Sequence, residues 1–231
     1  MGDATRTAEE IRAADHRFRV FAETTDAIDA MIADIRSARR RVWLETYWFA
    51  SDPVGQAVAD ALVERATAGL DVRVLYDAIG SQATSRTMWQ RLQAAGVRLH
   101  ADHTVWDALR WPPALLRVLN QRNHRKLLVV DEADAYFGSM NSVSTRSLFP
   151  PHDEESPPTA WRDLHLRMAG PKLPEVADSF ERSWRRAVLK RPGGRLRRRR
   201  LFNRRQRRDA VRFYDSGPGP SYTAAYRVYR R

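Results

Sequence analysis

The sequence contains no cysteine and no long hydrophobic run. Without cysteine, disulfides, thiolate nucleophiles and sulfur-ligated zinc sites are excluded, and the composition suits a reducing compartment. A membrane-spanning helix needs about 18 or more apolar residues, and the N-terminus mixes both charge signs where an export signal would be basic and then apolar. The histidines also lack the HExxH spacing of a metal site, so no metal and no other cofactor is expected. These absences predict a cytoplasmic protein.

Positive charge is abundant. Lysine and arginine total 40 against 28 acidic residues, a formal net charge of +12. This excess predicts an anionic partner such as nucleic acid, acidic lipid or a phosphorylated substrate. Much of it lies in the arginine-rich segment 191–209. That segment suits either a solvated linker or contact with phosphates, and by itself it does not separate lipid headgroups from a nucleic-acid backbone.

The first hundred residues alternate between strand-like and helix-like patterns. The first helix is predicted to start with a threonine N-cap, the second with a capping residue and a proline, and the third with a serine. The predicted segments, in chain order, are 17–21, 24–40, 41–49, 51–70, 72–77, 85–96 and 97–101. This alternation predicts an α/β fold in which helices cover both faces of a largely parallel or mixed sheet.

Two further segments allow more than one interpretation. Residues 104–123 are rich in Trp and Leu around a Pro-Pro pair, which suits a short helix packed beside the site or a patch that dips into a lipid headgroup layer. Residues 147–161 contain two Pro-Pro pairs and an acidic cluster. They predict a surface loop, and its position would also allow it to act as a lid.

The stretch NHRKLLVVDEADAYFGSMN, residues 123–141, carries the most specific pattern. LLVVD is typical of a short buried strand, and AYFGS of its neighbour after a turn. His124 and Lys126 are two residues apart, so on an extended segment their side chains project to the same face. We therefore expect an imidazole beside an ammonium group.

The residue types in this stretch suit the binding of a tetrahedral phosphoryl group. Lys126 supplies a cation, Ser139 and Asn141 supply neutral donors, and Gly138 lets the backbone approach closely. Neutral imidazole, with a reference pKa of about 6.5, can attack phosphorus and form a covalent intermediate. An adjacent ammonium disfavours protonation of His124, which keeps the nucleophile free.

The stretch resembles the full HKD motif of the phospholipase D superfamily, and the chain is most similar to its cardiolipin synthase-like members. The segments that resemble those members are ETYWFASDPVG, VRVLYDAIGS, AAGV, QRNHRK, WRDLHLRMAGP and FERSW, so the resemblance covers roughly residues 17–190. It implies a phospholipase D-like mixed sheet flanked by helices on both faces, one repeat of a pseudo-twofold pair. The implied domains are an extension at 1–16, the catalytic repeat at 17–190, an arginine-rich linker at 191–210 and the start of an incomplete second repeat at 211–231.

The resemblance also implies roles for the motif residues. His124 would be the nucleophile that forms a phosphohistidine, Lys126 and Asn141 would bind the phosphate with help from Ser139, and Asp131 would support the site structurally.

Family members place an acidic residue after the Gly-Ser-x-Asn step, where it holds the second nitrogen of the nucleophilic imidazole. Asp163 is the candidate here. A simple salt bridge of Asp163 with Arg162 or Arg167 is the alternative.

The chain departs from the family in carrying one HKD motif where members use two, since one histidine attacks and another protonates the leaving group. No other histidine has a lysine two residues later. Two explanations stay open. The chain forms a homodimer with a composite site, or it lacks a second half, whose opening elements residues 211–231 resemble.

Three functions follow from these observations. The first is a phospholipase D-type phosphatidyltransferase or phosphodiesterase that acts on an anionic phospholipid such as phosphatidylglycerol, with peripheral contact at the inner face of the cell membrane. The second is a metal-independent endonuclease that acts on nucleic acid as a homodimer. The third is an inactive half-enzyme that only binds anionic surfaces.

Overall fold

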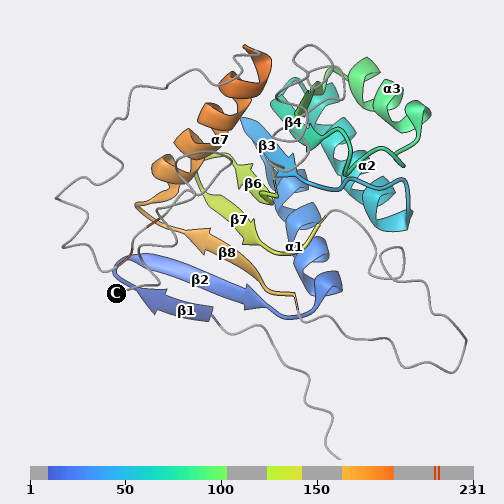
Figure 1. Ribbon diagram of the computed structural model, residues 1–231. Coiled ribbons are helices and arrows are strands. Elements are labelled where there is room, and N and C mark those ends of the chain that lie inside the picture. The colour runs from blue at the N-terminus through green and yellow to red at the C-terminus, as the bar shows by residue number, and fades with distance from the viewer. Residues whose placement is uncertain (1–9, 103–123, 142–162, 190–210, 212, 214–231) are drawn as a thin grey trace, which may run out of the picture.

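The protein forms one mixed eight-stranded sheet with helices packed on it (Figure 1). The computed structural model describes residues 10–102, 124–141, 163–189, 211 and 213. The strands follow the spatial order β1-β2-β8-β7-β6-β3-β4-β5. Their bounds are β1 Glu10–Ala13, β2 His16–Phe21, β3 Arg41–Thr46, β4 Asp71–Asp77, β5 Arg98–Asp102, β6 Leu127–Val130, β7 Asp134–Gly138 and β8 His165–Ala169. The helices are α1 Thr24–Ser37, α2 Pro53–Thr67, α3 Arg86–Ala94 and α7 Leu173–Val188.

The sheet has a parallel part and an antiparallel part. Strands β3, β4 and β5 run parallel, joined by the crossover helices α2 and α3. The pairs from β1 to β3 through β2, β8, β7 and β6 are all antiparallel. The predicted mixed α/β sheet is therefore confirmed.

Two of the three predicted helix starts are confirmed. The side chain of Asp52 accepts a hydrogen bond from the amide of Gly55 at 2.8 Å ahead of α2, and Ser85 accepts one from Met88 ahead of α3. The threonine cap of α1 is wrong. Glu23 takes the extended conformation of the N-cap and makes no side-chain capping bond, so the threonines fall inside the first turn.

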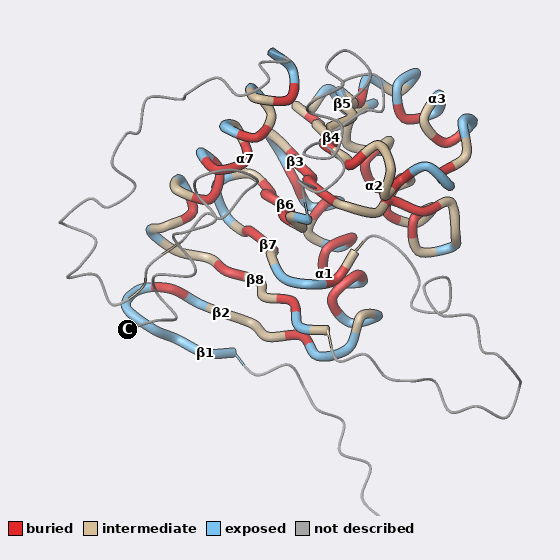
Figure 2. The backbone as a smooth tube through the Cα atoms, viewed as in Figure 1, coloured by how far each residue is buried: buried red, intermediate tan, exposed pale blue. Residues whose placement is uncertain are grey.

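Helices cover both faces of the sheet, as expected. On one face α1, α2 and α3 bury residues such as Met31 and Leu62 against β3, β4 and β6. On the other face α7 stacks Phe180 on Trp43 of β3, with ring centroids 5.3 Å apart. Figure 2 shows the buried residues concentrated in the central strands and on the inner sides of the helices.

Strand β6 shows why this sequence forms the centre of the sheet. Leu128 and Val130 belong to the core under α1, whereas Leu127 and Val129 belong to the core under α7. A strand that is buried on both faces reads as a continuous apolar run instead of an alternating one. The run LLVV thus fixes the residues on either side of it at the two ends of a central strand.

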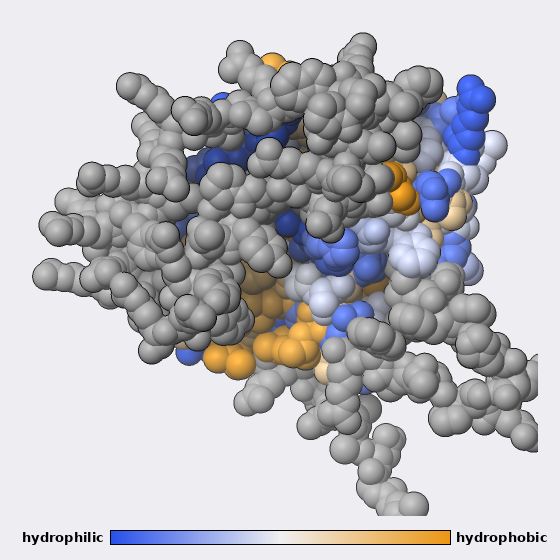
Figure 3. Space-filling model, viewed as in Figure 1, coloured by the Kyte–Doolittle hydropathy of each residue, from blue (hydrophilic) through white to orange (hydrophobic). Residues whose placement is uncertain are grey.

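The sheet begins earlier than the domain boundary expected at residue 17. Strand β1 pairs with β2, with Ile11 opposite Phe18. All four residues of β1 are exposed, which is typical of an edge strand. Hydrophobic surface gathers over this edge on the face seen in Figure 3, and 47% of Ile11 is exposed.

Several expectations fall outside the described residues. These are the interpretations of 104–123, of the loop 147–161 and of the linker 191–210, and all of 211–231 apart from residues 211 and 213. Of the last segment, Phe213 meets the ring of Phe137 edge-on at 6.0 Å. No helix in the described ranges is long and apolar enough to cross a membrane.

Candidate active site

The residues before β6 lie beside the end of β3 because these two strands are antiparallel, with Leu127 opposite Glu45. The ring of His124 stacks on that of Tyr47, with centroids 4.2 Å apart and an interplanar angle of 29°. The ammonium nitrogen of Lys126 lies 5.4 Å from the centroid of the same ring and donates to the backbone oxygen of His124 at 2.8 Å. Both side chains thus lie on one aromatic ring, on the shared face that their spacing predicts.

Arg125, between them, projects into the opposite face of the sheet. Its guanidinium donates to the hydroxyl groups of Ser179 and Ser183 on α7 and lies 3.5 Å from the carboxylate of Glu45. All three partners are buried. This contact, which the sequence did not predict, ties the segment that carries His124 to α7.

The turn after β7 is bound to the residues before β8. The amide of Ser139 donates to the backbone oxygen of Leu164 at 2.9 Å, and the hydroxyl of Ser139 accepts from the amide of Leu164 at 3.0 Å. Gly138 is required here because a Cβ would lie 2.8 Å from Nδ1 of His165 and would overlap the oxygen of Leu164. These contacts bring Ser139 next to the residue that follows Asp163.

Asn141 follows directly on this turn. Its side-chain oxygen is buried and has no hydrogen-bond partner within the described part of the chain. Buried polar atoms usually have a hydrogen-bond partner, so this oxygen is an exception within the described residues.

Asp163, Lys126 and His165 form an electrostatically coupled group. Burial lowers the pKa of Lys126, and the negative charge of Asp163 partly offsets that effect. Burial also lowers the pKa of His165 to about 4, with Asp163 opposing the change and Lys126 adding to it. His165 is thus neutral at neutral pH. Sequence reasoning overlooked it, although its place in DLHL marks it as an inward-facing strand residue.

The alternative partner of Asp163 within the described residues was Arg167. Arg167 instead pairs with Asp34 at 2.8 Å and with Asp134 at 3.2 Å. The other alternative, Arg162, lies outside the described residues. Asp163 thus acts electrostatically on Lys126 and His165, whereas Arg167 pairs with other carboxylates.

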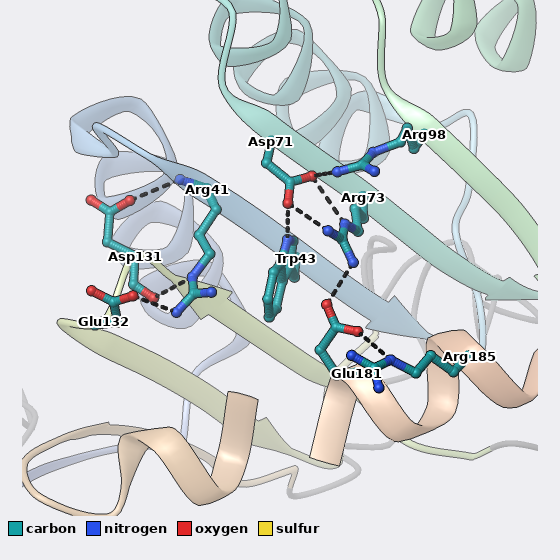
Figure 4. A network of polar contacts seen from close by, with 9 residues as sticks. All are labelled: Arg41, Trp43, Asp71, Arg73, Arg98, Asp131, Glu132, Glu181 and Arg185. Atoms are coloured by element: carbon teal, nitrogen blue, oxygen red, sulfur yellow. Dashed lines mark hydrogen bonds and ion pairs between the residues drawn. The ribbon is translucent and has the colours of Figure 1, made fainter. Parts of the chain in front are cut away.

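Asp131 lies at the far end of β6 from this group. Its carboxylate accepts hydrogen bonds from three consecutive backbone amides, those of Arg39, Arg40 and Arg41, at 2.9 to 3.0 Å. Burial would raise the pKa of Asp131, but the amides and the charge of Arg40 outweigh it and lower the pKa. Asp131 thus anchors the start of β3, as Figure 4 shows for its bond to Arg41.

The chain matches known proteins over most of this fold. Residues 31–154 match the family model described as "Cardiolipin synthase, PLD-like domain". Cardiolipin synthase A of Pseudomonas aeruginosa is 34% identical over 172 residues, which is 74% of this chain and 33% of that protein. The major cardiolipin synthase ClsA of Bacillus subtilis is 31% identical over 173 residues, which is 75% of this chain and 34% of that protein.

Because the family model covers more than half of the chain, the protein belongs to the phospholipase D-like family of cardiolipin synthase domains. The chain spans about one third of the length of the curated relatives it matches, which are covered to 33% and 34%.

Two solved structures share the fold. Nuc from Salmonella typhimurium, a phospholipase D family member, superposes with a TM-score of 0.51 at 19% identity, over 76% of this chain and 95% of Nuc. NucT from Helicobacter pylori gives 0.52 at 16% identity, over 76% of this chain and 97% of NucT. The expected phospholipase D-like fold is thus confirmed.

Proposed function

We propose that this chain is the His124 half of a phospholipase D-type phosphatidyltransferase or phosphodiesterase that acts on phospholipid phosphodiesters. The observation that carries the proposal is the convergence of His124 and Lys126 on one ring, at the end of the sheet where β7 also ends, three residues before Asn141. The similarity to proteins named cardiolipin synthases supports a phospholipid substrate. A phosphatidylglycerol molecule would supply both the phosphodiester and, with its glycerol headgroup, an acceptor alcohol.

The reaction would run in two displacements. A ring nitrogen of His124 attacks phosphorus, a nitrogen–phosphorus bond forms, and the bond from phosphorus to the leaving alcohol oxygen breaks. A general acid gives that oxygen its proton. In the second step the oxygen of an alcohol or of water attacks phosphorus, its proton passes to the same group acting as base, and His124 is released. Alcohol as acceptor gives transfer, and water gives hydrolysis.

The neighbouring groups suit these steps. Lys126 and the amide of Asn141 can donate to the phosphoryl oxygens as negative charge builds on them. Asp163 would accept a hydrogen bond from the second nitrogen of the His124 ring and hold the correct tautomer. Ser139 would hold the turn that leads to Asn141, because its hydroxyl is bonded to the backbone of Leu164.

The general acid has to come from a second copy of this fold, since the reaction needs two histidines of this kind. One source is a second copy of this chain related by a twofold axis. The other is further polypeptide outside this chain, which spans 33% of the length of the Pseudomonas aeruginosa relative. The net charge of +12 also supports peripheral contact with an anionic membrane surface.

The test is phosphatidyl transfer and hydrolysis on phosphatidylglycerol vesicles, measured over a range of protein concentrations with EDTA present. We expect activity that rises more steeply than linearly with concentration and disappears in His124→Ala. His100→Ala is the matched control, because His100 packs near Trp184 on the face of α7. No turnover at any concentration contradicts the proposal for this chain acting alone.

The net charge favours a second candidate, a metal-independent endonuclease that acts as a homodimer through the same phosphohistidine step. The same protein and variants are then incubated with DNA in EDTA. Cleavage that depends on His124, together with no reaction on vesicles, would replace the lipid assignment by this one.

A further inference from the structure

Side-chain hydroxyl groups hold the backbone at Tyr47 and on either side of it. The hydroxyl of Ser81 donates to the carbonyl oxygen of Tyr47 at 3.3 Å and accepts from the amide of Phe49 at 3.0 Å. The hydroxyl of Thr46 donates to the oxygen of Trp48 at 3.0 Å. The chain therefore leaves β3 through a bonded turn, and Tyr47 has a fixed backbone position.

The turn after β4 fixes the ring from a second side. The carboxylate of Asp77, which is buried, accepts from the amides of Ile79 and Gly80 at 3.0 and 2.9 Å. A Cβ on Gly80 would lie 3.1 Å from Cε2 of the Tyr47 ring and would overlap the Tyr47 carbonyl oxygen. Only glycine allows this turn to lie so close to Tyr47.

The position of Tyr47 does not follow from core packing alone. Tyr47 is half-buried and is a member of neither hydrophobic core cluster in the described part of the chain. Its ring face instead meets the ring of His124 at 4.2 Å, and the ammonium of Lys126 approaches the same ring.

We propose that Tyr47 is a positioning residue whose aromatic face stabilises the cationic form of the His124 imidazole. The ring is neutral before attack and becomes positively charged once its nitrogen is protonated or bonded to phosphorus. An aromatic face attracts a cation within about 6 Å of its centroid. Tyr47 meets this condition for both His124 and Lys126.

This position of the Tyr47 ring would reduce a charge repulsion within the site. The positive charge of Lys126 beside His124 favours the neutral imidazole before attack, but the same charge opposes the imidazolium that attack produces. The Tyr47 ring attracts both cations and so offsets their repulsion. The other charged groups at this end of the sheet within the described residues include Asp163, the buried Asp77 in the turn beside Tyr47, and Glu45, which pairs with Arg125 on the opposite face. The link to catalysis rests on the proposed function, whereas the effect on the imidazole does not.

The test compares three variants by NMR titration of the His124 ring, which is assigned by the resonance lost in His124→Gln. Tyr47→Leu removes the aromatic face, and we expect it to lower the pKa of His124 by about half a unit. Tyr47→Phe keeps the aromatic face, so the pKa of His124 should equal that of the wild type. Tyr76→Leu is the matched control, since Tyr76 stacks on Trp89 at 4.1 Å instead of on His124.

Equal His124 titration in the wild type, Tyr47→Leu and Tyr47→Phe would overturn the proposal. If Tyr47→Leu fails to fold, Tyr47→Met fills a comparable volume without an aromatic face and is read in the same way. Because the titration needs no substrate, a shift in Tyr47→Leu without any transfer activity would leave this inference standing and defeat the proposed function. Where transfer is observed, Tyr47→Leu should lower kcat several-fold with little change in KM.

Discussion

Lys126 and Asp131 lie at opposite ends of strand β6. Lys126 borders the ring of Tyr47 at one end, and Asp131 receives three backbone amides at the other. A strand advances about 3.3 Å per residue, so the four residues of β6 keep these side chains well apart. The motif therefore spans two separate places, the end of β6 where we propose that the reaction occurs and the end that anchors β3.

Replacing Asp131 by Asn should lower the free energy of unfolding by about 1 to 3 kcal/mol, because the amide nitrogen cannot accept the bonds that the carboxylate accepts. Urea denaturation at neutral pH measures the change, with the exposed Asp178→Asn as control. The titration of His124 should be unchanged. Because folding lowers the pKa of Asp131, its contribution is present above about pH 4 and is lost as the pH falls further. Wild-type stability in Asp131→Asn would contradict its anchoring role.

His165 should make the protein sensitive to mild acid. Its pKa is about 4 in the folded state and about 6.5 when unfolded, so its contribution is complete above pH 6.5 and is lost as the pH falls toward 4. Between pH 7 and pH 5 the contribution of His165 to the free energy of unfolding should fall by about 2 kcal/mol.

The measurement is the urea midpoint at the two pH values in the wild type, His165→Gln and the control His100→Gln. His165→Gln should show the smaller dependence on pH. An equal dependence in all three proteins would mean that His165 does not titrate as its burial requires.

Replacing Arg125 should lower the free energy of unfolding more than replacing a surface arginine does. Arg125→Met leaves the buried Glu45 without this cation, and we expect a loss of about 3 kcal/mol. Arg125→Lys should recover part of it, because an ammonium keeps the charge but cannot reach Ser179 and Ser183 in the same fork geometry. Thermal and urea unfolding measure both variants. Arg39→Met, on the surface, is the control, and an equal loss there would contradict the assignment.

Local sequence patterns predicted the central elements of this fold. Asp52 and Ser85 begin helices because their side chains satisfy free backbone amides, an effect that depends on a few adjacent residues. The apolar run of β6 marks a strand covered on both faces. Strand β1 was missed because its residues, EIRA, are all exposed and carry no burial pattern.

The parts of the site that the sequence did not predict depend on strand order. Tyr47 meets His124 because β3 pairs with β6, across a large separation in sequence. His165 lies opposite Gly138 because β7 pairs with β8. Asp131 belongs to the same motif as Lys126, and the length of β6, which the motif alone does not give, separates the two side chains.

In the function that we propose, His124 becomes covalently bound to phosphorus. The most direct test is to mix the protein with labelled phosphatidylglycerol vesicles, stop the reaction at alkaline pH, where phosphohistidine persists, and map the label by mass spectrometry. We expect a phosphatidyl adduct on His124 that is absent in His124→Gln and present in His100→Gln. Label on another residue, or phosphatidyl transfer that continues in His124→Gln, would contradict it.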